Sequence, residues 1–363
     1  MSEPRRLMGS GYLEWAKTQA AARYNLATSG VAHYPLSDLG VKLDELELSG
    51  PSWYGYEPLQ KMLAAKCGVD PEMAVAATGT SMANHLAMAA TIEPGDEVLI
   101  EWPAYDPLLR SALYLGAEIK RFERPPDSGF RIDIDRVERA ASSRTRLIVI
   151  TNLHNPSGAF TDEETLARLA DIARRSKARV LVDEVYLEAM FERAPRSACH
   201  LGREFITTSS LTKVYGLSGL RCGWALAEPA LARRMWRLND LFGVIPAHPA
   251  ELLSVIALEK LDKIALRAKG IIETNRPLLD RFFDSRDDLI IERPEFGTVA
   301  FPRLARGTVD GLCALLREKY ETTIVPGSFF EMPDHFRIGI GCDTSILASG
   351  LKRLGAALDE LRV

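Results

Sequence analysis

The chain has 363 residues, enough for two domains or one large one at roughly 150 residues per domain. Charged residues make up 26%, and Gly and Pro occur at ordinary frequencies, which excludes collagen, coiled coils and wholesale disorder. The formal net charge of −4 gives no electrostatic support for binding nucleic acid or an acidic membrane surface.

The first residues are charged, and no apolar segment typical of a signal peptide follows them. Residues 73–92 carry no charge and are long enough to cross a membrane. Polar side chains at 78–81 and a glycine-centred turn instead predict a short strand and a helix, so we expect no membrane association. The five cysteines have no C-x-x-C spacing, and their odd number favours reduced thiols and a cytoplasmic location.

Short β-type runs alternate with helix-type runs between residues 74 and 228. The expected strands are 74–78, 97–101, 146–152, 180–182, 205–209 and 222–227. Helices are expected at 82–92 and 105–115, after a Thr161–Glu164 capping box, and from Pro229 onward. Continuous apolar strands separated by amphipathic helices predict an α/β fold, with a buried, mainly parallel sheet and helices on both faces.

The pattern changes after about residue 250, where charged helices become longer. Helices are expected at 250–262, 265–285, 311–320 and 346–363, with strand-like segments at 297–302 and 336–341. We interpret this as a smaller α+β domain that packs with the first 40 residues. The predicted division is therefore 41–250 for the large domain, and 1–40 with 251–363 for the small one.

Polar motifs follow several of the predicted strands. In an open parallel sheet, ligands bind at the carboxyl ends of the strands. Thr-Gly-Thr-Ser at 78–81 could receive an anion at a helix start, and Asn-Pro-Ser-Gly at 155–158 and Asp183, with Tyr186 three residues on, end two further strands. Each also has an ordinary structural interpretation, as a capped turn, a loop or a helix N-cap.

The most informative stretch is a Ser/Thr-rich loop that contains Lys213. Ser210, Thr212 and Arg221 offer two hydroxyl donors and a forked cation, which suit a phosphate group. The neutral amine of a lysine in such a site can form a Schiff base with an aldehyde. Phosphate and aldehyde together indicate pyridoxal 5'-phosphate (PLP), whose ring nitrogen requires an acid that Asp183 could supply.

Five motifs in this order carry a family resemblance. They are Thr-Gly-Thr-Ser (78–81), Pro-x-Tyr (103–105), Asn-Pro-Ser-Gly (155–158), Asp-Glu-x-Tyr (183–186), and Ser-x-Thr-Lys with Gly-x-x-Gly-x-Arg (210–221). The chain, from about Tyr54 to the last helix, resembles the fold-type I, PLP-dependent aminotransferases of class I and II. The resemblance implies a large PLP domain with a sheet of the seven-stranded type.

The resemblance also implies roles around the cofactor ring. Lys213 matches the Schiff-base lysine, and Asp183 matches the partner of the ring nitrogen. Asn155 and Tyr186 match the pair that binds the phenolic oxygen, and Tyr105 matches the aromatic residue that stacks on the ring. Lys213, Asp183 and Tyr186 are therefore the expected catalytic residues.

The phosphate and the substrate carboxylate have their own matches. The residues implied for the phosphate are Gly79, Thr80, Ser81, Ser210, Thr212 and Arg221. Arg337, in Phe-Arg-Ile-Gly-Ile, matches the residue that binds the substrate α-carboxylate, and Asn155 is expected to be a second substrate-binding residue. Without the family context, a surface arginine on a strand would be the simpler interpretation of Arg337.

Two regions depart from the family pattern. Tyr54 or Tyr56 corresponds to a tyrosine that reaches the partner subunit's phosphate, and we favour Tyr54, but Pro58 stands where the family has Gly. The resemblance therefore implies a homodimer. Residues 25–35 also depart from the usual form, which leaves the substrate side chain undefined. His154 is either a substrate contact or a loop histidine with internal partners.

We expect a transaminase that moves an amino group from an amino acid to a 2-oxo acid. A PLP-dependent lyase or decarboxylase is the alternative, because the same residues serve those reactions. A DNA-binding regulator would need a winged helix before residue 40, and no basic recognition helix occurs there. No metal-ligand spacing is present. Met235, Trp236 and Phe242 have helical spacing and are expected in the core.

Overall fold

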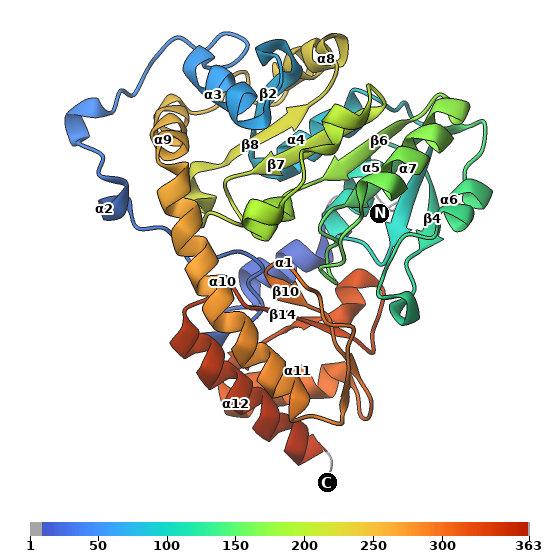
Figure 1. Ribbon diagram of the computed structural model, residues 1–363, viewed down its shortest axis with the longest axis vertical. Coiled ribbons are helices and arrows are strands. Elements are labelled where there is room, and N and C mark those ends of the chain that lie inside the picture. Colours follow the sequence, from blue (N-terminus) through green and yellow to red (C-terminus); the bar gives the residue numbers. More distant parts are fainter. Residues whose placement is uncertain (1–8, 362–363) are drawn as a thin grey trace, which may run out of the picture.

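The computed structural model describes residues 9–361. The first eight residues of the predicted small domain, and residues 362–363 of the last predicted helix, lie outside the described residues. A large sheet with its helices forms one part, and a smaller part lies beside it (Figure 1). The long helix α10 (Leu261–Asp284) runs from the first part into the second.

The large sheet has seven strands in the order β2-β8-β7-β6-β5-β3-β4. They are β2 (Ala74–Thr78), β3 (Glu97–Trp102), β4 (Glu118–Glu123), β5 (Thr145–Thr151), β6 (Arg179–Asp183), β7 (Phe205–Ser210) and β8 (Cys222–Leu226). Strand β8 is antiparallel to both of its neighbours, and the pairs among β7, β6, β5, β3 and β4 are parallel. The sheet is mainly parallel, as the sequence predicted.

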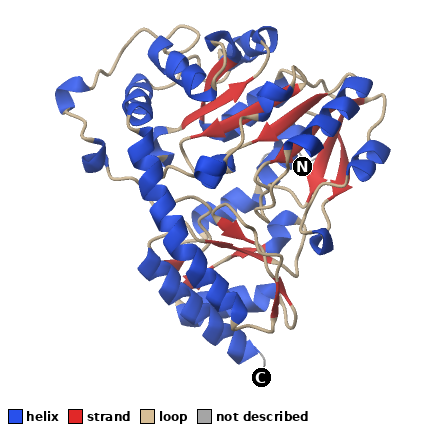
Figure 2. Cartoon of the chain, in the orientation of Figure 1, coloured by secondary structure: helices blue, strands red, loops and turns tan. Residues whose placement is uncertain are grey.

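Helices cover both faces of this sheet (Figure 2). They are α3 (Glu57–Cys67), α4 (Gly79–Ala89), α5 (Asp106–Tyr114), α6 (Ile134–Ala140), α7 (Glu163–Ser176) and α8 (Pro229–Asn239). Ile148 and Ile150 of β5 pack in the core under α6 and α7, and Leu147 and Val149 belong to the core on the other side, with α4. The continuous apolar strands of the sequence follow from burial on both faces.

The smaller part combines short strands with three long helices. Its elements are α10, α11 (Val309–Tyr320), α12 (Thr344–Leu361), β9 (Leu289–Ile290), β10 (Val299–Ala300), β11 (Arg303–Leu304), β12 (Thr322–Thr323), β13 (Val325–Pro326) and β14 (Phe336–Gly339). Strands β10, β14 and β13 form an antiparallel sheet, and β9 pairs with β11. Helix α9 (His248–Glu259) spans the predicted domain boundary at residue 250.

The N-terminal arm joins the smaller part to the large one. It contains α1 (Gly11–Thr18), β1 (Tyr24–Asn25) and α2 (Leu36–Leu39). Strand β1 pairs with β12, and the Gly339 N–H donates to Leu26 O at 2.7 Å. Five residues after Leu26, the Val31 N–H donates to Lys213 O at 2.7 Å. The arm therefore passes directly beside the predicted Schiff-base lysine.

The structure corrects three details of the sequence prediction. Phe242 is 50% exposed rather than buried, although Met235 and Trp236 are in the core. Strand β4 was not predicted, because an edge strand of sequence Glu-Ile-Lys-Arg-Phe-Glu lacks an apolar run. The cap of α7 is Asp162 and not Thr161, because Thr161 is held by a hydrogen bond to Asn152 Oδ1.

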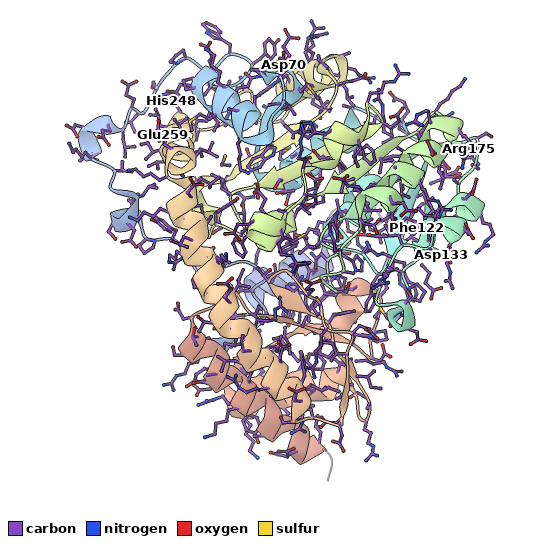
Figure 3. All side chains as sticks on the ribbon, viewed as in Figure 1. Asp70, Phe122, Asp133, Arg175, His248 and Glu259 are labelled. Atoms are coloured by element: carbon purple, nitrogen blue, oxygen red, sulfur yellow. The ribbon has the colours of Figure 1, made fainter. Side chains whose placement is uncertain are left out.

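Charged side chains lie on the outer helices, as Asp133 and Arg175 show beyond the edge of the sheet (Figure 3). All five cysteines are free. No helix within residues 9–361 is long and apolar enough to span a membrane.

Candidate active site

A cavity of about 530 Å³ lies at the carboxyl ends of strands β5, β6 and β7. Parallel strands bring their last residues to one edge of a sheet, so residues far apart in sequence meet there. The residues with predicted roles that line it are Thr80, Ser81, Tyr105, Asn155, Asp183, Tyr186, Ser210, Thr212, Lys213 and Arg221. The lining also includes residues that the motifs did not identify, namely Leu13, Lys17, Asn84, Thr151 and Val185.

Asp183 is the last residue of β6, and its carboxylate is buried. Asn84 Nδ2 donates to Oδ2 at 2.8 Å, and the Val185 N–H donates to Oδ1 at 3.1 Å. Burial raises the pKa of Asp183 to about 6, although these hydrogen bonds and the charge of Lys213 oppose the increase. A protonated ring nitrogen placed here would favour the ionised carboxylate.

Asn84 holds Asp183 from helix α4. Thr208 Oγ1 donates to Asn84 Oδ1 at 2.5 Å, which directs the amide nitrogen toward the carboxylate. The sequence contained one sign of this role, because Asn84 is a polar residue in a helix without Asp, Glu, Lys or Arg, and in the structure it is buried.

Lys213 and Tyr186 meet at a residue of the N-terminal arm. Lys213 Nζ donates to Ser29 Oγ at 3.1 Å, and the Tyr186 hydroxyl donates to the same oxygen at 2.7 Å. Ser29 is only 4% exposed. No motif pointed to Ser29.

Buried hydroxyl groups without partners mark one end of the cavity. Thr80 Oγ1 and Thr212 Oγ1 are buried and have no hydrogen-bond partner among the described residues. Buried polar groups normally have a partner, so these two hydroxyls are available to a ligand. Ser210 lies beside them, and its Oγ accepts from the Thr212 N–H at 3.2 Å.

Arg221 completes this end of the cavity. Its Nη2 donates to Thr78 O at 3.3 Å, next to the first turn of α4. Gly79 has a φ of +76°, and a Cβ atom there would lie 2.2 Å from Arg221 Nη2. Glycine at this position therefore makes room for the guanidinium group. Hydroxyls, a guanidinium group and a helix N-terminus together form a donor set for an anion of phosphate size.

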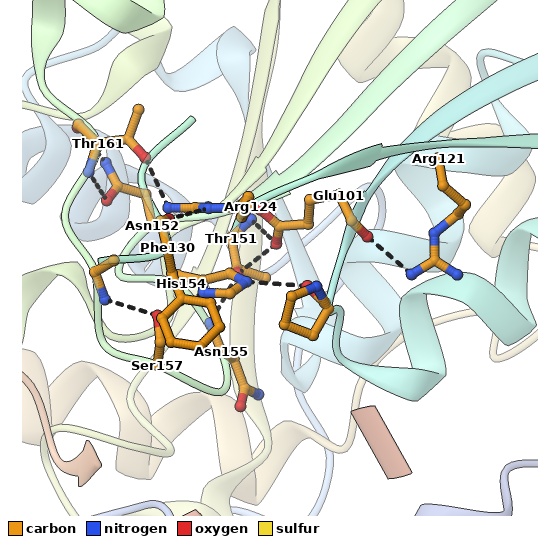
Figure 4. Close-up of polar contacts among 12 residues, drawn as sticks. Glu101, Arg121, Arg124, Phe130, Thr151, Asn152, His154, Asn155, Ser157 and Thr161 are labelled. Atoms are coloured by element: carbon orange, nitrogen blue, oxygen red, sulfur yellow. Dashed lines mark hydrogen bonds and ion pairs between the residues drawn. The ribbon is translucent and has the colours of Figure 1, made fainter. Parts of the chain in front are cut away.

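A buried ion pair supports Asn155 through Thr151, and Figure 4 shows these residues together with the loop that follows β5. Its backbone N–H donates to Thr151 Oγ1 at 2.9 Å, and Thr151 Oγ1 donates to Glu101 Oε1 at 2.7 Å. Arg124 Nη1 lies 2.6 Å from Glu101 Oε2, and both side chains are fully buried. This chain of contacts fixes the position of Asn155 at the cavity wall.

Arg337 lies on β14 and contacts Asn155 and Tyr12 of helix α1. Its Nη1 donates to Asn155 Oδ1 at 2.8 Å, and its Nη2 donates to the Tyr12 hydroxyl at 2.9 Å. The side chain is fully buried, and Nε has no partner among the described residues. The ring of Tyr12 also packs edge-on against Tyr105 at 5.7 Å. The unpartnered Nε is therefore a donor available to a substrate carboxylate.

The residues with predicted roles that lie outside the cavity lining include Arg337, which is fully buried beside Asn155. Tyr54 is 53% exposed, and Gly79 lies behind Arg221. His154 is buried, with Nδ1 2.6 Å from Ser157 Oγ and Nε2 3.0 Å from Pro103 O. Burial and the charge of Arg124 hold the pKa of His154 well below its ordinary value. Of the two interpretations of His154, the structure supports the loop histidine with internal partners.

Other parts of the molecule offer no metal site among the described residues, and a cavity of similar size lacks the residues with predicted roles. Within the described part of the chain, no group of three or more His, Cys, Asp or Glu residues is arranged to hold a metal ion. A second cavity of about 550 Å³, bordered by residues 129–132, 157–162 and 292–296, contains none of the residues with predicted roles.

Comparisons with known proteins identify the family of the chain. Residues 44–354 match the sequence model of the family described as aminotransferase class I and II. Capreomycidine synthase of Streptomyces vinaceus is 30% identical over 98% of this chain and 95% of that protein. A probable N-succinyldiaminopimelate aminotransferase of Mycobacterium tuberculosis is 30% identical over 77% of this chain and 74% of that protein.

Among solved structures, a PLP-dependent aminotransferase from Streptococcus suis has the same fold. The TM-score is 0.92 over 99% of both chains, and the sequence identity is 27%. The match confirms the predicted α/β fold with its mainly parallel sheet flanked by helices.

Proposed function

The chain belongs to the family of class I and II aminotransferases, and we propose that it is a transaminase with PLP bound at Lys213. Transamination, which the motifs predicted, is the activity that the aminotransferase relatives support. The observation that carries the cofactor proposal is the cavity that brings Lys213, Asp183 and two unpaired buried hydroxyls to one edge of the sheet.

The residues present fit PLP in donor type and number. Thr80, Ser81, Ser210, Thr212 and Arg221 would hold its phosphate, with Gly79 leaving space for the arginine. Asp183 would bind the ring nitrogen, Asn155 and Tyr186 the phenolic oxygen, and Tyr105 the face of the ring. When bound, PLP supplies an aldehyde for amines and a protonated ring that accepts electrons from the substrate α-carbon.

The chain itself would bind substrate and move protons. Arg337 and Asn155 bind the substrate α-carboxylate, which fixes the α-carbon near Lys213. The free amine of Lys213 removes the α-proton and later returns a proton to the reacting carbon. The carboxylate of Asp183 keeps the ring nitrogen protonated throughout. The amino group of an amino acid is thereby transferred to a 2-oxo acid.

Replacing Lys213 tests this proposal. The purified wild-type protein, reduced with borohydride, should carry the cofactor mass on the peptide that contains Lys213. Lys213→Ala should lack that adduct and lose roughly a thousandfold or more in turnover. Lys352→Ala, an exposed lysine on α12, is the matched control and should behave as wild type. A fully active Lys213→Ala protein would overturn the assignment.

A PLP-dependent lyase or decarboxylase remains the alternative, because it would use the same residues. Visible spectra recorded with each amino acid in turn separate the two. Conversion of the cofactor to its amine form, with release of a 2-oxo acid, supports transamination. An unchanged cofactor spectrum during product formation supports the alternative.

We further propose a homodimer whose partner supplies Tyr54 to the phosphate. Support comes from exposed apolar side chains in two segments, Leu43–Tyr54 and Leu241–Ile245. The first segment contacts α9, the helix that follows the second segment, where Ser52 Oγ lies 3.1 Å from Glu251 Oε2. The free cysteines and the net charge support a cytoplasmic protein that acts on small molecules without nucleic acid.

We also propose that the two parts are domains with the predicted boundaries. The large domain would comprise residues 41–250, and the small domain residues 1–40 and 251–363. The pairing of β1 with β12 supports the grouping of the N-terminal arm with the C-terminal part.

A further inference from the structure

Ser29 lies at the centre of the active site although no motif includes it. Its Oγ accepts a hydrogen bond from Lys213 Nζ at 3.1 Å and another from the Tyr186 hydroxyl at 2.7 Å. The side chain is 4% exposed, so water does not compete strongly for these contacts. One hydroxyl thus joins two of the three residues proposed as catalytic.

The backbone holds Ser29 in this position from both parts of the molecule. The Val31 N–H donates to Lys213 O at 2.7 Å, which ties the arm to the lysine itself. Thr298 Oγ1 donates to Ser29 O at 2.6 Å from the smaller part. A Cβ atom on Gly30 would lie 3.2 Å from Lys213 O, so the two backbones approach closely. These contacts fix the backbone at Ser29 and so hold its side chain close to Lys213.

A serine hydroxyl suits an amine that changes its protonation state. It has one donor and two acceptor positions, so it can accept from an ammonium group and donate to a neutral amine. The proposed role of Lys213 requires both states, since its amine takes a proton and returns one. Ser29 keeps its own proton in this scheme, and no bond to its oxygen forms or breaks.

We propose that Ser29 binds the free amine of Lys213 and keeps it beside Tyr186 while the lysine transfers protons. This inference rests on the proposed role of Lys213. Removing the hydroxyl should loosen the amine, make it more accessible to reagents and slow the proton transfer. The effect should be about five- to tenfold, within the range expected for the loss of one intramolecular hydrogen bond.

The first readout uses the protein freed of any cofactor. Trinitrobenzenesulfonate labels lysine amines, and mass spectrometry follows the peptide that contains Lys213. Ser29→Ala should be labelled there about five- to tenfold faster than wild type, and Ser29→Thr, which keeps a hydroxyl, should be labelled at the wild-type rate. Thr298→Val is the matched control, because it removes the contact to Ser29 O but keeps the hydroxyl; its rate should stay within about twofold.

The second readout is the α-deuterium isotope effect on kcat in the PLP-loaded enzyme. Ser29→Ala should lower kcat about five- to tenfold, leave KM within about twofold and increase the isotope effect. Ser29→Thr should restore all three values. If the threonine variant does not fold, Ser29→Cys takes its place and should resemble Ser29→Ala, because a thiol is a weak hydrogen-bonding group.

Two results would overturn the inference about Ser29 alone. The first is a Ser29→Ala variant with the labelling rate and the isotope effect of wild type. The second is a Thr298→Val variant that changes as much as Ser29→Ala does, because the contact would then be purely structural. Absence of the borohydride adduct on Lys213 in the wild-type protein would instead remove the proposed function, and the role of Ser29 with it.

Discussion

Glu184 follows Asp183 but does not line the active-site cavity. Its buried carboxylate accepts from the Ala198 N–H at 2.8 Å and from Ser197 Oγ at 2.6 Å. Burial raises the pKa of Glu184 to about 7 from an ordinary value of 4.5, against the effect of these hydrogen bonds. A carboxyl group with a higher pKa in the folded state than in the unfolded state destabilises the folded chain when it ionises.

We expect Glu184→Gln to remove this pH dependence. Wild type should lose stability relative to the variant as the pH rises from about 4.5 to about 7, and the difference should be constant above that range. Its size should be up to about 3 kcal/mol, since one pKa unit corresponds to roughly 1.4 kcal/mol. Urea unfolding of both proteins at the two ends of this range measures the difference.

Glutamine is a suitable replacement because it preserves the contacts of Glu184. Its amide oxygen can accept from the Ala198 N–H, and its amide nitrogen can donate to Ser197 Oγ, which in turn can donate to Thr207 Oγ1 at 2.9 Å. A stability difference that stays constant across the range would contradict the ionisation of a buried Glu184.

Individual residues differed in how well the sequence revealed them. Lys213, Asp183 and Asn155 were predicted to meet because each follows an apolar strand within an ordered motif, and the structure places all three at one cavity. Ser29 lies in a loop without periodicity, and it contacts Lys213 from 184 positions away. Such a contact depends on how the arm crosses the sheet, which one sequence does not record.

At the scale of elements, the start of α7 shows how neighbouring polar residues compete. The sequence predicted Thr161 as the cap, with Glu164 completing a capping box. In the structure, Asp162 has an extended backbone, and its Oδ1 accepts from the Thr165 N–H at 2.8 Å. Thr161 is instead buried, and its N–H donates to Asn152 Oδ1 at 3.0 Å. The cap lies one residue later than predicted because Thr161 is held in the loop after β5 by its hydrogen bond to Asn152.

Substitution of the cap should therefore matter at Asp162. We expect Asp162→Ala to lower the free energy of unfolding by about 1 kcal/mol, because one N–H at the helix start loses its acceptor. Asp162→Asn keeps an acceptor oxygen and should stay within about 0.5 kcal/mol of wild type. Denaturant unfolding near neutral pH compares the three proteins. Equal stability of the alanine variant and wild type would show that the cap contributes nothing.

The elements that the sequence predicted best were those buried on both sides. Strands β5, β6 and β7 were predicted within about two residues, because a continuous apolar run defines them. Strand β4 is a half-exposed edge strand whose sequence mixes charged with apolar residues, so it has no continuous apolar run by which to predict it. The direction of β8 depends on pairing across the sheet, and the predicted strand run alone did not give it.

At the scale of the whole molecule, the site lies where the arm and both parts meet. Lys213 and Asp183 come from the large sheet, Arg337 from β14 of the smaller part, and Ser29 and Tyr12 from the arm. The family resemblance implied a role for Arg337, which in the structure donates to Asn155 Oδ1. The contact of Tyr12 with Arg337 joins residues 325 positions apart and was not predictable from either local sequence.

The exposed apolar segments provide the test of the proposed homodimer. Leu241 and Val244 are 79% and 65% exposed, so substitutions there leave the core of one chain intact. Burial of two such side chains in an interface contributes about 3–6 kcal/mol, or roughly two to four orders of magnitude in the dissociation constant. We expect the wild-type protein to elute at twice the mass of one chain, which is 40.2 kDa. The double variant Leu241→Asp with Val244→Asp should elute as a single chain. It should also bind PLP at least about tenfold more weakly than wild type.

Ile290→Asp is the matched control, because Ile290 is 51% exposed on β9 of the smaller part, far along the chain from both segments. It should remain dimeric and bind PLP as wild type does. The weakened PLP binding follows from the proposed contribution of Tyr54, which a single chain leaves exposed at 53%, away from its own cavity lining. A wild-type protein that elutes as one chain and still binds PLP tightly would contradict the shared site. If the double variant dissociates but binds PLP as tightly as wild type, the proposed dimer stands and the proposed contact of Tyr54 with the phosphate is wrong.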